Sequence, residues 1–157
     1  MKRTWWRVPL YCLVAGWICF QLEIRFLGRF ALVKLPDGSL SSDSTRWMIM
    51  SGILFLVVIL VGGLVFFRGM TRKQLFCSAS VLVCLNIVIG LIVYVTQGMA
   101  AFFWAELSEW DSFVSQLLIS TGLNIWVSTV IVWVLPPYVF VLFGKSGHNR
   151  GEQDEKV

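Results

Sequence analysis

Long apolar runs separated by short polar stretches dominate the pattern of this chain. No Asp, Glu, Lys, Arg or His occurs in residues 47–67, 74–96 or 116–143, and Arg7 is the only ionisable residue in 5–22. A hydrocarbon core about 30 Å thick is crossed by roughly 20 helical residues. Each run supplies about that length, so the pattern predicts four membrane crossings.

Helices are the expected structure of these runs, because lipid offers no partners for free backbone N–H and C=O groups. The strict alternation of a membrane barrel strand is missing. We therefore predict an all-α integral membrane protein with four transmembrane helices in an antiparallel bundle. The predicted spans are 5–22, 47–67, 74–96 and 116–135 in a domain of residues 1–143, followed by a disordered tail at 144–157.

The first segment between spans predicts two further elements. Leu22, Phe26 and Phe30 recur at four-residue spacing, so we expect the first helix to continue out to the interface. The Leu-Pro-Asp-Gly sequence at 35–38 suits a type I turn with Pro second and Gly fourth. A small extracytoplasmic hairpin is predicted there.

The second outer segment, residues 97–115, mixes aromatic side chains with the acids Glu106, Glu109 and Asp111. This composition predicts a short amphipathic helix lying in the membrane interface, where Trp is favoured. Glu106 and Glu109 lie on one side of such a helix and would suit a catalytic carboxylate pair. We interpret them instead as hydrated surface acids.

Charge sets the predicted orientation. Hydrophobic residues make up 57% and charged residues 14% of the chain, whereas a soluble domain carries about 25% charged residues. Nine basic residues fall on one side of the membrane, namely Lys2, Arg3, Arg7, Arg68, Arg72, Lys73, Lys145, Arg150 and Lys156. The other side has Arg25, Arg29, Lys34 and Arg46. The positive-inside rule predicts both termini in the cytoplasm, and we expect a bacterial plasma membrane.

The formal net charge of +4 is explained by this topology signal, so we predict a lipid bilayer as partner and no nucleic acid. The four cysteines lie inside apolar runs without His or acids beside them, and we expect small buried hydrophobes. The single histidine, His148, excludes a Ser-His triad or a multi-His metal site. We predict no catalytic residue, no metal and no cofactor.

One polar pattern links the third and fourth spans. At about 100° per residue, polar and small residues share a face on each helix. They are Asn86, Gly90 and Gln97 on the third, and Gln116, Ser120, Asn124 and Ser128 on the fourth. The simpler interpretation is packing through hydrogen bonds worth about 0.6 kcal/mol each. The alternative is a polar path or binding cavity, against which stands the lack of an ionisable residue in the middle of a span.

Pro136 and Pro137 interrupt the fourth run. Two prolines remove two backbone donors, so they should end or kink the helix near Leu135. We interpret them as a helix break, with the following residues tilted or lying along the cytoplasmic interface.

Three classes of function remain after these exclusions. The small soluble surface favours a non-enzymatic accessory protein or subunit that pairs with another membrane protein or with a second copy of itself. A small transporter or channel would use the polar stripe. An intramembrane enzyme would depend on Glu106 or Glu109, and the sequence favours it least.

Overall fold

The computed structural model describes residues 4–96, 104 and 106–145 of this protein. Four helical segments in this part are long and apolar enough to cross a membrane. Their bounds are Arg7–Ala31, Ser44–Phe66, Arg72–Val93 and Ile125–Phe143. The prediction of four membrane-length helices is confirmed.

The first span is longer than 5–22. Helix α1 (Arg7–Leu22) continues through the π-helical turn η1 (Glu23–Leu27) into α2 (Gly28–Ala31), as the spacing of apolar residues predicts. Strands β1 (Leu32–Lys34) and β2 (Leu40–Ser42) follow as an antiparallel hairpin. The Gly38 N–H donates to the Leu35 carbonyl at 2.9 Å, and Gly38 has a φ of 85°, which glycine adopts without strain.

The second and third spans follow without such extensions. Helix α3 (Ser44–Val61) begins where the Asp43 side chain accepts hydrogen bonds from the backbone N–H groups of Thr45 and Arg46. It ends in the π-helical turn η2 (Gly62–Phe66). Helix α4 (Arg72–Thr96) returns across the bundle.

The fourth span differs from the prediction. Instead of one helix starting at Gln116, the chain forms the 3-10 turn η3 (Glu109–Asp111), α6 (Ser112–Ser120), α7 (Ile125–Val134) and the 3-10 helix η4 (Pro136–Phe143). The break falls at Gly122, whose φ is 82°, and Asn124 caps α7 by accepting from the Trp126 N–H at 2.9 Å. The apolar run therefore holds a short helix and a separate span, Ile125–Phe143.

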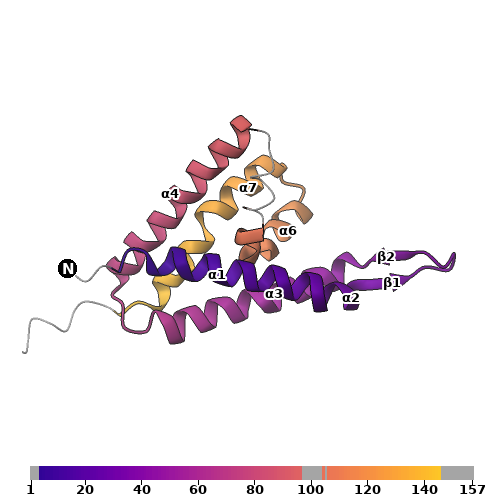
Figure 1. The fold of residues 1–157 in the computed structure, drawn as a ribbon, viewed down its shortest axis with the longest axis horizontal. Helices are drawn as coiled ribbons and strands as arrows, with labels where there is room; N and C mark the ends of the chain where they lie inside the picture. The colour runs from indigo at the N-terminus through magenta and orange to yellow at the C-terminus, as the bar shows by residue number, and fades with distance from the viewer. Residues whose placement is uncertain (1–3, 97–103, 105, 146–157) are drawn as a thin grey trace, which may run out of the picture.

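The helices form two pairs. Figure 1 shows α1 running along α3, to which the Tyr11 hydroxyl bonds, with the hairpin projecting past them, and α4 beside α7 at an angle to the first pair. Helix α1 also packs on α4. The η3 turn and α6 lie between the pairs, where η3 packs on α1 and α6 on α3.

Both ends of the described chain lie at the end of the bundle opposite the hairpin. The Ser78 hydroxyl on α4 donates to the Trp5 carbonyl at 2.8 Å, and the Lys145 N–H donates to the Met70 carbonyl at 3.0 Å. Order therefore reaches Lys145, two residues into the segment predicted to be disordered. Residues 146–157 of that segment lie outside the described residues.

An aromatic cluster holds this end of the bundle together. The ring of Phe140 on η4 lies 5.0 Å from Phe67, 5.9 Å from Tyr11 and 5.8 Å from Trp110, measured between centroids. These residues come from four different parts of the chain. Phe140 and Phe67 are fully buried, so the cluster forms the inner core against which the helix pairs pack.

Candidate functional site

The described part of the segment expected to lie in the membrane interface, residues 104 and 106–115, is inserted into the bundle. Its Leu107 backbone rests on Gly16 of α1, where an added Cβ would lie 2.6 Å from the Leu107 carbonyl carbon. Gly16 lies about 14 Å along the helix from Arg7. Residues 97–103 and 105 lie outside the described part, but the described remainder of the segment corrects the interfacial prediction. The missing side chain at Gly16 makes room for this insertion.

The insertion brings two acids together. Glu23, on the π-helical turn of the first span, is 5% exposed, and its carboxyl group faces that of half-buried Glu109 on η3. Glu23 also contacts Ser112 at the start of α6. A hydrogen bond between two carboxyl groups needs a proton on one of them. Two like charges in contact repel, so a pair of this kind can share one proton.

Two further side chains connect this pair to the hairpin end of the bundle. The Ser51 hydroxyl donates to Glu23 Oε1 at 3.4 Å, and Gln116 Nε2 donates to Ser51 Oγ at 3.4 Å. Gln116 also lines a hollow of about 700 Å³. Its other polar lining residues come from the end of β2, the start of α3 and α6, and they are Ser42, Ser44, Thr45 and Ser120. A polar connection thus runs from this outer hollow to Glu23.

A third acid lies deeper. Asp111 is 4% exposed and lies near Glu109 on one side and near Cys12 of α1 on the other. Cys12 lies about 8 Å along the helix from Arg7, whereas Glu23 lies about 24 Å along it. Asp111 therefore lies further from the hairpin than Glu23 does. Beyond Asp111, the rings around Phe140 close the end of the bundle opposite the hairpin.

The predicted polar stripe is not assembled as one face. Asn86 donates from Nδ2 to the Trp133 carbonyl at 3.2 Å, and Gly90 lies against the Trp133 ring, so these two residues join α4 to α7. Gln116 instead turns to Ser51 of α3. Ser120 bonds within α6, Asn124 caps α7, and Ser128 is fully buried with an unpartnered hydroxyl. Gln97 lies outside the described residues.

The position of Asn124 leads to a stability prediction. Because its side chain caps α7, Asn124→Ala should lower the free energy of unfolding by about 1 kcal/mol. Asn124→Asp is the matched control, since Asp also caps well and should cost little. Equilibrium unfolding in detergent measures both variants. Equal stability of Asn124→Ala and the wild type would contradict the assigned cap.

The cysteines divide into two kinds. Cys12 and Cys19 on α1 are buried, as predicted, but Cys77 and Cys84 on α4 are exposed on the outside of the bundle. The prediction of four buried thiols is wrong for that second pair, because α4 packs with its opposite side. Among the described residues no group of three or more His, Cys, Asp and Glu side chains is placed to hold a metal ion.

Sequence reasoning missed the acidic site. It placed Glu23 beyond the end of the first span and Glu109 on a hydrated surface, and neither residue alone signals burial. The one available signal was the four-residue spacing after Leu22, which carries the helix past Glu23. The pairing of Glu23 with Glu109 depends on how deeply residues 106–111 enter the bundle. That depth is determined by contacts between residues far apart in the sequence.

Comparisons with protein-family models, with curated proteins and with solved structures find no match to this sequence.

Proposed function

We propose that this chain is a small membrane transport protein in which the Glu23 and Glu109 carboxyl pair carries a proton. The observation that supports this most is the pair itself, with Glu23 buried and Glu109 half-buried, and its connection to the hollow through Ser51 and Gln116. Ionisable residues inside membrane bundles are costly, and they commonly mark ion pathways and proton relays. The sequence offers no ionisable residue in the middle of a span, but buried Glu23 lies within the first span and supports transport.

The insertion between the helix pairs suggests how such a path would work. Protons enter from the hollow, reach Glu23 and Glu109, and pass to Asp111 nearer the middle. The aromatic cluster around Phe140 blocks the remaining distance in this conformation. Release on the inner side then requires the η3 turn to shift relative to α1. Loss of the proton from the carboxyl pair supplies a reason for that shift, because it leaves two like charges in contact.

Proton flux into liposomes that contain the purified full-length chain tests this function. A pH-sensitive dye inside the vesicles should report flux above that of empty vesicles. Glu23→Gln keeps the shape of the side chain but removes the exchangeable proton, and it should lower the flux at least about tenfold, the effect of roughly 1.4 kcal/mol on the barrier.

Glu106→Gln is the matched control, because it makes the same change one helical turn before Glu109. Its flux should stay at the wild-type level. Wild-type vesicles no more permeable to protons than empty ones, under a gradient of either sign, would contradict the proposal. So would undiminished flux through a correctly folded Glu23→Gln variant.

A second candidate is an accessory subunit, which the hairpin favours. Strands β1 and β2 project beyond the bundle with Leu32, Leu35 and Leu40 exposed. A lone two-stranded hairpin is marginally stable in water, so a partner surface would stabilise it. A photocrosslinking residue at Leu40 should capture one discrete protein in native membranes, whereas the same residue at exposed Leu142 should not. Equal capture at both positions would count against this candidate.

A further inference from the structure

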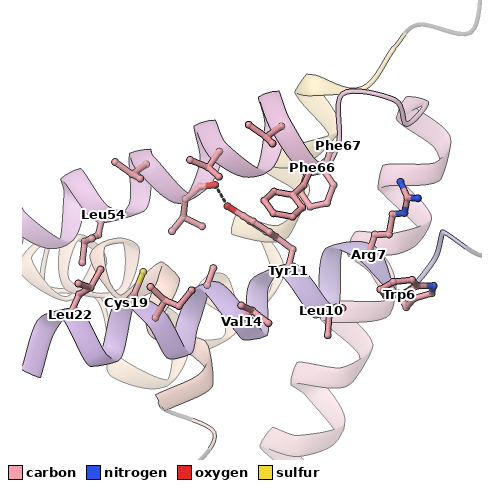
Figure 2. Close-up of a pocket in the computed structure, with 16 residues that line it drawn as sticks. Trp6, Arg7, Leu10, Tyr11, Val14, Cys19, Leu22, Leu54, Phe66 and Phe67 are labelled. Carbon is pink, nitrogen blue, oxygen red and sulfur yellow. Dashed lines mark hydrogen bonds between the residues drawn. The ribbon is translucent and has the colours of Figure 1, made fainter.

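A second feature of the molecule, unrelated to the acidic pair, is a lateral groove between α1 and α3. It has a volume of about 780 Å³ and runs along α1 from Trp6 to Leu22 (Figure 2). Its rim is formed by branched aliphatic side chains, many of them more than two-fifths exposed. They include Leu10, Val14, Ile18, Val57, Val61 and Val65. The floor is tied together by Tyr11, whose hydroxyl donates to the Val58 carbonyl at 2.6 Å.

One end of the groove differs from the rest. Figure 2 places Arg7 and Trp6 at that end, and Leu22 and Leu54 at the other. Arg7 is the only charged residue in the lining. Within the part of the chain that the structure describes, no carboxylate forms a salt bridge with Arg7. The groove thus combines a long apolar channel with one positive charge at its end.

This combination selects among possible occupants. Transmembrane helices pack closely through small residues such as Gly, Ala and Ser. The rim here is made of large branched side chains, with Ala15 as the one small residue at the groove. The Tyr11 hydroxyl already has its partner, so the apolar part offers little for a polar helix residue to bind. A flexible hydrocarbon chain needs neither feature and adapts to an uneven apolar surface.

We propose that this groove binds a phospholipid with an anionic headgroup, its phosphate against Arg7 and one acyl chain along α1 and α3. The predicted orientation puts Arg7 at the cytoplasmic surface, where anionic lipids are concentrated. Half of the hydrocarbon core is about 15 Å deep, whereas the groove runs for about 24 Å along α1. An inner-leaflet chain therefore fills the part nearest Arg7, past Tyr11 and Val61, and leaves the outer part to other lipids.

Native mass spectrometry of the purified full-length chain with added phosphatidylglycerol or phosphatidylcholine tests this site. The wild type should retain one phosphatidylglycerol with about fivefold preference over phosphatidylcholine, the ratio expected for one basic residue near an anionic lipid. Arg7→Gln should abolish the preference, and Arg7→Lys should restore most of it. Arg68→Gln is the matched control, since it removes a nearby exposed arginine that does not line the groove.

A second pair of variants tests the apolar part. Val61→Trp should fill the groove and reduce retention of both lipids, whereas Leu142→Trp, at a position 75% exposed elsewhere on the bundle, should not. Equal retention of the two lipids by the wild type would overturn the proposal, and so would an Arg7→Gln variant that keeps the preference. A dimer that Val61→Trp dissociates, with no lipid retained by the wild type, would assign the groove to a second copy of the chain instead.

Discussion

Gly16→Val should displace the inserted segment and abolish proton flux. A Cβ at Gly16 would overlap the carbonyl group of Leu107, which is backbone and has no alternative rotamer. Overpacking inside a bundle typically costs about 1–3 kcal/mol, and a clash with backbone belongs at the upper end of that range. The least costly relaxation moves the η3 turn away from α1, and Glu109 then moves away from Glu23.

Two measurements separate this result from general misfolding. Hydrogen exchange of backbone amides in residues 106–111 should speed up strongly in Gly16→Val, while amides in the middle of α3 stay protected. Flux into liposomes should fall to the level of Glu23→Gln. Gly69→Val is the matched control, because an added Cβ at Gly69 meets nothing within 4 Å and its stability should change by less than about 0.5 kcal/mol. Unchanged exchange in Gly16→Val would contradict the described insertion.

The spans and the hairpin could be predicted because each depends on local information. An uncharged run of membrane length must form a helix in lipid, whatever it packs against. The turn at Leu35 to Gly38 is specified by its own residues. Lys145 shows the opposite case, since its order depends on hydrogen bonds to the loop before α4, far away in sequence.

The break before α7 was harder to predict. Gly122 and Asn124 lie in an uncharged run, where isolated Gly and Asn are tolerated within a transmembrane helix. The sequence therefore allowed either one tilted helix or two shorter ones. Packing decides between them, because α6 lies against α3, with Phe113 against Gly52, while α7 lies against α4. Because α6 and α7 pack on different helices, Gln116 and Asn86 do not meet, and the polar stripe predicted for a single helix does not form.

Phe140→Ala should be the most destabilising single substitution proposed for this chain. The Phe140 ring is fully buried and contacts the rings of Tyr11, Phe67 and Trp110, so its removal leaves a cavity where α1, η2, η3 and η4 meet. Replacing a buried Phe by Ala typically costs about 3–5 kcal/mol. Movement of the surrounding segments into the cavity would not restore the aromatic contacts, because Phe140 is the ring that the other three share.

The matched control for Phe140→Ala is Leu142→Ala, two residues along the same 3-10 helix and 75% exposed. It should change the free energy of unfolding by less than about 0.5 kcal/mol. Phe140→Leu keeps most of the volume and should lie between the two. Unfolding in mixed micelles with increasing SDS measures all three variants. A cost for Phe140→Ala no greater than that for Leu142→Ala would mean that the helix pairs are not joined through this cluster. The proposed proton path would then lack the aromatic closure at the end opposite the hairpin.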